Sequence, residues 1–254
     1  MSELERAWEF ECALQDRFAR TRKEFELGTA LFDDSLRRVY DANFVRFERG
    51  FEELTADAVE GFADELQASM RHRKVVIPHE EAGARVAEEL RARGWRFERL
   101  VTMAYRRERG ALPDPAERTV EEVPLPALRF ARERSLASPK RDADARRQII
   151  DFTYLVGRST PMRPFAARGD RAEVASFCTL FQRGGIGQVD DVTTLKQYRR
   201  RGLAAAVVGG AVRSSLADGD EFIFLVADDA DWPKDWYARL GFEPIGRRYE
   251  LLRA

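Results

Sequence analysis

A continuous apolar run near the C-terminus, FIFLVA at Phe222–Ala227, constrains the fold more than any other feature. A run of this kind is typical of a strand that is buried on both faces of a sheet. A helix is predicted before it at 203–216, where apolar side chains recur at helical spacing. A second helix is predicted after it at 232–240, with Gly241 at its C-terminal cap. The end of the chain is therefore expected to alternate helix and strand.

The middle of the chain alternates apolar strands with short glycine-containing turns. Arg168-Gly169-Asp170 and Arg183-Gly184-Gly185 have the composition of hairpin turns, because glycine and aspartate tolerate positive φ. Other elements predicted here are strands at 119–123, 165–168, 173–182, 186–195 and 249–253, and helices at 125–136 and 143–155. Together they predict an α+β fold in which a mixed, mostly antiparallel sheet is flanked by helices.

The chain has 254 residues, which corresponds to one large domain or two small ones. Leu112-Pro113-Asp114-Pro115 cannot continue a helix, because proline lacks the N–H and restricts the residue before it. We therefore predict two domains, 1–112 and 113–254. The first resembles a degenerate copy of the second, since a strand at 74–77 and a helix at 80–93 are followed by Gly94 and another strand. Two unrelated halves with similar endings are the alternative.

Composition excludes several classes of function. The chain has 43 Lys and Arg against 44 Asp and Glu, so nothing drives it as a whole toward nucleic acid or an anionic membrane. It has no run of about 18 apolar residues and an acidic start without an apolar leader, so we expect a cytoplasmic protein. Two cysteines and two histidines predict neither a disulfide framework nor a metal site. His72 and His79 are expected at the surface.

The segment from Val192 to Ala204 leaves a strand, crosses a basic turn and enters a helix. The first N–H groups of a helix lack partners and carry partial positive charge, which suits a phosphate or pyrophosphate. Gly202 removes a Cβ from this turn, and Arg199 to Arg201 add cationic side chains. The segment matches neither a P-loop nor a dinucleotide fingerprint. By itself it is equally compatible with a solvated basic turn.

Two motifs in this order resemble the GCN5-related N-acetyltransferase (GNAT) family. The family's turn signature, Gln/Arg-x-x-Gly-x-Gly/Ala, is matched by Arg199–Ala204, and its Tyr-x-x-Leu-Gly-Phe signature by Tyr237–Phe242. The resemblance covers about residues 115–254 and reaches 1–109 only as a degenerate repeat. It implies a GNAT-like fold, duplicated along the chain, with a central sheet that splays between two strands.

The resemblance implies acetyl-CoA as co-substrate and no metal. The strands at 173–182 and 188–194 are expected to splay apart around the thioester, and a backbone N–H of the former would polarise its carbonyl. The strand end should pair with the pantetheine arm through Val192, Thr193 and Thr194. The coenzyme pyrophosphate should lie on the backbone of Arg199, Arg200, Arg201, Gly202, Leu203, Ala204 and Ala205.

By the same resemblance, Tyr237 is the general acid that protonates the departing thiolate. Asp190 is the candidate base, since many relatives carry a glutamate there. Alternation along a strand places Asp190 and Asp191 on opposite faces, and we favour Asp190 in the cleft. Its shorter side chain favours a water relay to the amine. Simple solubility of the hairpin is the alternative explanation of these two carboxylates.

The chain also departs from the family pattern. Ala230 stands where many relatives have asparagine, Leu90 stands at the position in the first half that matches Tyr237, and Trp232 is expected in the core. We predict transfer of an acetyl group to a small-molecule or peptide amine by a monomer or homodimer. The acceptor would be selected by the loops around 136–164 and by the N-terminal half. The alternatives are a non-catalytic CoA-binding or protein-interaction module, and transfer of a longer acyl group.

Overall fold

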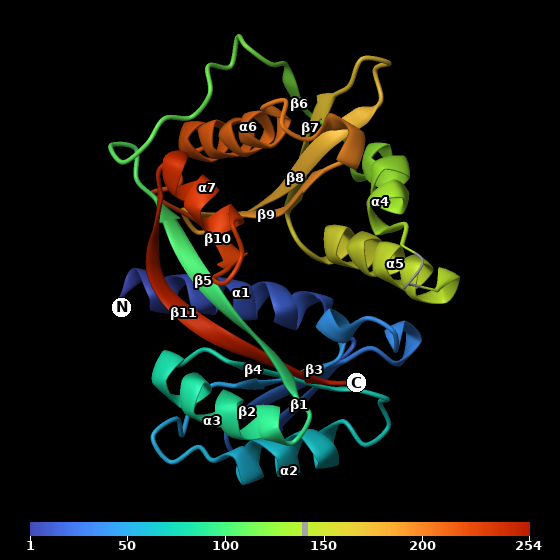
Figure 1. Ribbon diagram of the computed structural model, residues 1–254, viewed down its shortest axis with the longest axis vertical. Helices are drawn as coiled ribbons and strands as arrows, with labels where there is room; N and C mark the ends of the chain where they lie inside the picture. The colour runs from blue at the N-terminus through green and yellow to red at the C-terminus, as the bar shows by residue number, and fades with distance from the viewer. Residues whose placement is uncertain (139–141) are drawn as a thin grey trace. The chain divides into compact units, whose positions relative to one another are not determined.

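The computed structural model describes residues 1–138 and 142–254, and the chain forms two compact units (Figure 1). Unit 1 consists of Met1–Thr102, Ala227–Lys234 and Ile245–Ala254. Unit 2 consists of Met103–Val226 and Asp235–Pro244. Residues 139–141, which belong to the loops expected to select the acceptor, lie outside the described residues. The chain therefore passes between the two units more than once.

Unit 1 is built on a mixed sheet. Strands β1 to β3 pair antiparallel, and β3 then pairs parallel with β4, with Val45 opposite Val75. One face of this sheet packs against two helices through a buried core that includes Val59, Val86 and Leu90. The elements are α1 (Glu3–Phe18), β1 (Thr21–Phe25), β2 (Gly28–Phe32), β3 (Phe44–Phe47), α2 (Ala56–Leu66), β4 (Arg73–Ile77), α3 (Glu80–Ala92) and the start of β5 (Arg96–Tyr105).

Unit 2 also has a mixed sheet. Strands β6 to β9 are antiparallel neighbours, and β9 pairs parallel with β10. The elements are β6 (Val120–Glu122), α4 (Arg129–Leu136), α5 (Ala143–Ser159), β7 (Met162–Arg168), β8 (Val174–Arg183), β9 (Ile186–Thr194), α6 (Leu203–Ala217), most of β10 (Phe222–Asp228), α7 (Pro233–Arg239) and the start of β11 (Phe242–Arg253). Short 3-10 helices at Leu125–Leu128 and Lys196–Tyr198 precede α4 and α6. The predicted α+β class is confirmed.

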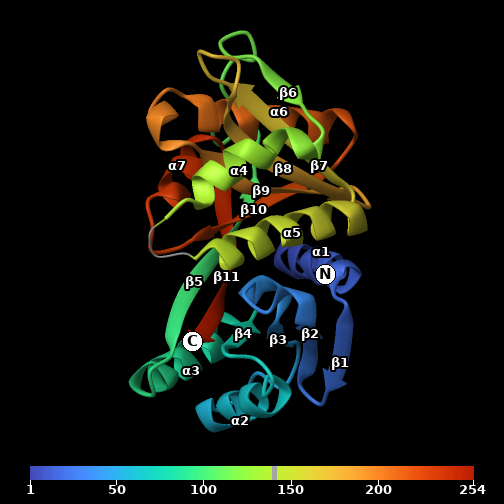
Figure 2. The same cartoon turned by 90° about the vertical axis from the view of Figure 1, so that its right-hand side faces the viewer.

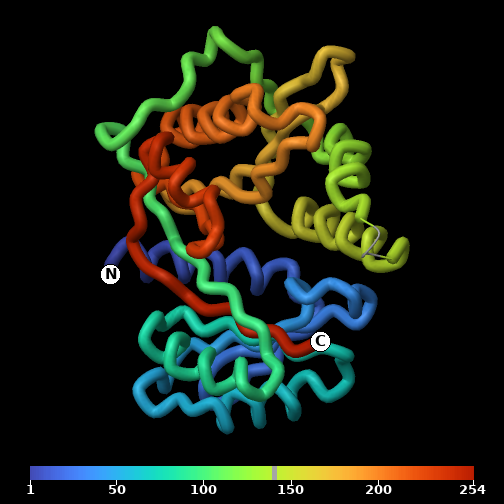
Figure 3. Tube along the Cα trace, viewed as in Figure 1, coloured from blue at the N-terminus to red at the C-terminus, as the bar shows by residue number. Residues whose placement is uncertain are grey.

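Helices cover the sheet of unit 2 on both faces (Figures 1 and 2). On one face α6 contacts β7, β8 and β9 through buried Val207, Val208 and Ala211. On the other face α4 contacts β8. The irregular connection from β5 to β6 (Figure 3) is tied to α6, because Arg213 Nη1 donates to the carbonyl of Pro113 at 3.0 Å. The predicted interruption at Leu112–Pro115 is therefore present.

The same order of elements occurs twice along the chain. Three antiparallel strands are followed by a helix, a parallel strand, a helix and a last strand, first in β1 to β5 and again in β7 to β11. The last strand of the second copy, β11, pairs antiparallel with β4, with Tyr249 opposite Ile77. This is the element order expected of an internal duplication.

The compact units differ from the predicted domains 1–112 and 113–254. Their first border lies between Thr102 and Met103, inside β5, and Ile245–Ala254 belongs to unit 1. The physical reason is that β4 has an edge of backbone N–H and C=O groups that need partners. The C-terminal strand β11 supplies them, although it is far away in sequence.

The strands that separate are β9 and β10. Their parallel register is limited to three pairs and ends at Gln188–Phe224, although both strands continue beyond it. The expected splay between strands 173–182 and 188–194 is wrong, because β8 and β9 remain paired from Arg183–Ile186 to Ser176–Thr194. Their ladder has one irregularity, between Phe177 and Thr179. An antiparallel hairpin keeps its register through its turn, whereas strands joined through a helix are free to diverge.

Two expectations about single residues are also wrong. His72 is buried, and its Nε2 lies 2.9 Å from the carbonyl oxygen of Asn43. Burial accordingly lowers the pKa of His72. Trp232 is 67% exposed and is not part of the core. Among residues 1–138 and 142–254, no helix is both long and apolar enough to span a bilayer, and no group of three acidic, histidine or cysteine side chains is arranged to hold a metal ion.

Candidate active site

The turn between β9 and α6 has an unusual backbone. Arg200 and Gly202 both have positive φ, at 62° and 77°. A Cβ added to Gly202 would meet no protein atom within 4 Å. The left-handed conformation, and not crowding by the protein, therefore favours glycine here. The space beside Gly202 remains open to a ligand.

The start of α6 presents free backbone donors. Gly202 is the N-cap residue, and no side chain caps the helix. The first helical bond runs from the N–H of Ala206 to the carbonyl of Gly202 at 3.0 Å, so Leu203, Ala204 and Ala205 have no acceptor within the described chain. Free N–H groups at the positive end of a helix form an anion-binding site.

Two of the three arginines of the turn support its own structure. Arg199 Nε donates to the carbonyl of Thr194 at 3.3 Å. Arg201 Nη1 lies 3.0 Å from the carboxylate of Asp170, and its guanidinium lies over the ring of Tyr198 at 5.3 Å. Arg200 is exposed. Of the three cations predicted at the phosphates, Arg200 is therefore the one without an internal partner among the described residues.

Tyr198 anchors this turn, a role that the sequence did not single out. Its side chain is buried, and its hydroxyl donates to the carboxylate of Glu173. A Cβ on Gly169 would lie 2.8 Å from the Tyr198 ring, so the ring packs directly on that glycine. The hairpin Arg168-Gly169-Asp170 therefore packs against the ring that anchors the turn. Gly169 is the sequence signal for this contact, because a larger residue there would clash with Tyr198.

Tyr237 lies on α7 with its side chain 8% exposed. Its ring packs between Trp236 and Phe242, at centroid distances of 4.8 and 6.0 Å. Burial raises the pKa of the Tyr237 phenol, and the negative charge of Asp190 raises it further. The phenol therefore keeps its proton at neutral pH.

Asp190 and Asp191 occupy an irregular stretch of β9. Asp191 has a φ of 52°, and the ladder skips from Phe177–Thr193 to Thr179–Asp190. This is a β-bulge in which Asp191 and Val192 together oppose one residue of β8. The backbone N–H of Asp191 donates to Asp190 Oδ1 at 2.8 Å.

The two carboxylates have different surroundings. Asp191 forms an ion pair with Arg132 of α4 and accepts a hydrogen bond from Thr193 Oγ1 at 3.4 Å. Burial nevertheless raises the pKa of Asp191. Asp190 is exposed and contributes to the electrostatic environment of Tyr237. Asp191 is thus held by the protein itself.

Cys178 lies in β8 opposite the bulge. Its side chain is fully buried, and its Sγ lies 3.3 Å from the carbonyl oxygen of Val207 on α6. Burial raises the pKa of the Cys178 thiol. A protonated, buried thiol is a poor nucleophile, so Cys178 is a packing residue of the core.

The end of β9 has one edge without a strand. Beyond Gln188 the register of the described residues gives this strand no partner on β10, so Thr193 and Thr194 pair on one side only, with β8, and Val192 lies in the bulge. The Ser176 and Thr194 hydroxyls lie 2.8 Å apart and hold this end of the pair together. Such an edge can accept an extended ligand by β-strand addition.

The corresponding turn of unit 1 is filled by its own side chains. Thr55 Oγ1 caps α2 by accepting from the N–H of Ala58 at 3.2 Å. Arg85 Nη2 donates to three carbonyls of this turn, those of residues 51, 52 and 54. Leu90, which matches Tyr237 in position, is fully buried. The start of α2 is therefore capped by a side chain, whereas the start of α6 is not.

A cavity of about 400 Å³ lies elsewhere in unit 2. Its lining includes Val123, Leu125, Gly157 and Met162, near the start of β7. None of the predicted site residues lines it.

No protein-family model and no curated protein matches this chain. Its fold is similar to a conserved protein of unknown function from Staphylococcus epidermidis, with 15% identity, coverage of 92% of this chain and 94% of that one, and a TM-score of 0.71. It is also similar to a GCN5-related N-acetyltransferase from Kribbella flavida, with 22% identity, coverage of 96% and 93%, and a TM-score of 0.61. A tandem GNAT protein from the clavulanic acid biosynthesis pathway aligns at 15% identity over 89% of this chain and 78% of that one, with a TM-score of 0.52. The chain has the GNAT fold.

Proposed function

We propose that this protein is an N-acetyltransferase that moves an acetyl group from acetyl-CoA to an amine within a ternary complex. The observation that carries the proposal is the uncapped start of α6, with its left-handed turn and free N–H groups. The turn suits a pyrophosphate, because the free N–H groups of α6 follow Gly202, where an added Cβ would meet no protein atom within 4 Å. The GNAT fold gives this turn its functional interpretation.

Each part of the coenzyme is assigned to a different segment of unit 2. The N–H groups at the start of α6 and the side chain of Arg200 would bind the pyrophosphate. The free edge of β9 would pair with the pantetheine arm at Val192–Thr194 and place the thioester. The donor that polarises the thioester carbonyl is better assigned to β9 than to the predicted strand 173–182, because β8 is paired on both sides.

The transfer needs a proton donor and a proton acceptor. Tyr237 would donate its phenolic proton to the departing thiolate, since its raised pKa keeps the proton available. Asp190 would receive the proton of the attacking amine, directly or through water. Asp191 is less suited to that role, because Arg132 and Thr193 already occupy its carboxylate. Positioning of the two substrates would supply most of the acceleration.

Calorimetric titration with acetyl-CoA tests the proposal. Gly202→Asp places a carboxylate where the pyrophosphate would bind, so we expect binding to weaken at least about 100-fold. Gly184→Asp is the matched control, because Gly184 also has positive φ, at 59°, and open space around its Cβ position, but lies in the β8–β9 turn. Equal affinity in the two variants would contradict the proposed coenzyme site.

Turnover is tested separately by release of the coenzyme thiol. The amine panel contains L-lysine, spermidine and a short peptide with a free N-terminus, each added with acetyl-CoA. We expect thiol release with at least one of these amine classes. Binding of acetyl-CoA without release on any amine would contradict catalysis and favour a non-catalytic CoA-binding module.

A further inference from the structure

An ion pair between a buried arginine and a partly exposed aspartate crosses from α4 to the bulge of β9. The side chain of Arg132 is 10% exposed, and its Nη2 pairs with Asp191 Oδ2. Its guanidinium lies over the ring of Phe177 at 5.0 Å. The Arg132 Nε is buried without any hydrogen-bond partner. Arg132 thus reaches Asp191 although one of its donors is left unsatisfied.

This pair is poorly explained as a stabilising contact. Removing the Arg132 charge from water offsets much of its attraction to Asp191, and the unsatisfied buried Nε adds to the cost. Arg163 of the same unit is different, because its donors reach Glu122, Gln182, Asp218 and Ser214. Arg163 is an ordinary structural arginine at the β6–β7 edge, whereas Arg132 is directed at one residue of a bulge.

The bulge connects the two faces of the sheet. Asp191 is turned to Arg132 on the α4 face, while its own backbone N–H donates to Asp190 Oδ1 at 2.8 Å. The negative charge of Asp190 in turn raises the pKa of the Tyr237 phenol. Arg132 is therefore linked to the proposed proton donor through one ion pair, one peptide unit and one carboxylate.

We propose that Arg132 and Asp191 are positioning residues for acetyl transfer: their ion pair fixes the β9 bulge and thereby places the Asp190 carboxylate and the free edge of β9 against the thioester. This inference rests on the function proposed above. Bulges near active sites commonly re-aim a side chain in this way. The pair does not touch the pyrophosphate turn, so its loss should affect the acetyl end of the ligand and leave the phosphate end unchanged.

The test compares acetyl-CoA with CoA in calorimetric titrations. The variants are Arg132→Met, Asp191→Asn and the double variant, in which no unpaired charge stays buried. Asparagine tolerates positive φ, so Asp191→Asn removes the charge and keeps the backbone preference. We expect acetyl-CoA affinity to fall about tenfold, the loss of one well-placed hydrogen bond, and CoA affinity to change less than about twofold.

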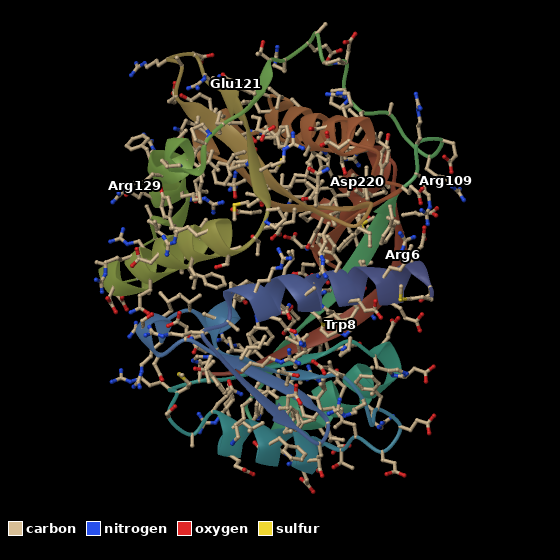
Figure 4. All side chains as sticks on the ribbon, turned by 180° about the vertical axis from the view of Figure 1, so that it is seen from behind. Arg6, Trp8, Arg109, Glu121, Arg129 and Asp220 are labelled. Atoms are coloured by element: carbon tan, nitrogen blue, oxygen red, sulfur yellow. The ribbon has the colours of Figure 1, made fainter. Side chains whose placement is uncertain are left out.

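Two arginines serve as controls. Arg129 lies on α4 one turn before Arg132, is exposed and pairs with Glu133 at 3.0 Å (Figure 4). Arg163→Met removes a well-satisfied arginine of the same unit. We expect both Arg129→Met and Arg163→Met to keep the wild-type ratio of acetyl-CoA to CoA affinity. A loss of stability alone would lower the melting temperature without changing that ratio.

A second readout does not depend on the coenzyme. Cys178 lies opposite the bulge, so its reaction rate with 4,4′-dithiodipyridine in a Cys12→Ser background reports whether the bulge is fixed. We expect faster modification in Arg132→Met than in Arg129→Met. Unchanged thiol rates and affinity ratios would overturn the inference. If the wild type binds neither CoA nor acetyl-CoA, the proposed function fails, and the thiol rates then support or overturn the role of the pair in fixing the bulge.

Discussion

At the scale of the residue, the proposed transfer depends most on the Tyr237 phenol, whose raised pKa keeps it protonated at neutral pH. Replacement of Tyr237 by phenylalanine keeps the ring between Trp236 and Phe242 and removes only the hydroxyl. We expect kcat to fall about 10²–10⁴-fold, the usual contribution of a general acid, with the dissociation constant of acetyl-CoA within about twofold. Thiol release and calorimetry measure the two effects. An unchanged kcat would remove Tyr237 from the mechanism.

The raised pKa of Tyr237 also predicts how the transfer rate depends on pH. The pKa of Tyr237 lies above the ordinary tyrosine value, so the phenol is protonated and able to donate at every pH below about 10. A fall in rate between pH 7 and 10 must therefore come from another group. The pH profile of the residual activity of Tyr237→Phe should keep the wild-type shape in that range. A pH–rate profile of Tyr237→Phe that differs in shape from the wild-type profile between pH 7 and 10 would contradict the raised pKa of Tyr237.

At the scale of the element, the two strand–turn–helix segments have the same topology and different chemistry. The start of α6 is open, whereas Thr55 and Arg85 close the start of α2. Thr55→Ala should lower the free energy of unfolding by about 1 kcal/mol through loss of the cap, and should leave acetyl-CoA affinity unchanged. Urea denaturation and calorimetry measure both quantities. A binding stoichiometry of two sites per chain would show that unit 1 also holds coenzyme.

The elements around the site could be predicted because their patterns are local. The boundaries of β9, α6 and β10 follow from the apolar run, the glycine turn and Asp218-Gly219-Asp220, and the structure agrees within about two residues. The bulge at Asp191 could not be predicted, because Arg132 holds it from a distant part of the chain. The separation of β9 from β10 likewise depends on pairing between strands, which no local pattern encodes.

At the scale of the whole molecule, unit 1 depends on the last strand of the chain. Leu251 is fully buried in the unit 1 core and lies opposite Val75 of β4. We expect Leu251→Ala to lower the free energy of unfolding by about 2–5 kcal/mol. Faster hydrogen exchange in residues 73–77 would locate the damage in unit 1. Leu252→Ala, at a half-buried neighbour, is the matched control and should cost much less.

The division into units illustrates why domain borders were harder to predict than motifs. Leu112–Pro115 is irregular as its prolines require, yet the first segment of unit 1 ends at Thr102, within a strand. A proline segment reports only that the local chain is not helical or a central strand. The pairing of β4 with β11 joins two segments that are far apart in the sequence. No local sequence pattern near β4 predicts that β11 is its partner.

The pairing of β4 with β11 has a consequence for synthesis. A ribosome makes β4 well before β11, so during translation the emerging sheet of unit 1 has an edge whose partner does not yet exist. Unpaired strand edges invite association with other chains. The nascent protein should therefore need protection by a chaperone, or rapid elongation, until Tyr249–Arg253 has left the exit tunnel. Nascent chains stalled before β11 should aggregate or bind chaperones, whereas chains stalled on a C-terminal extension long enough to bring β11 out of the tunnel should not.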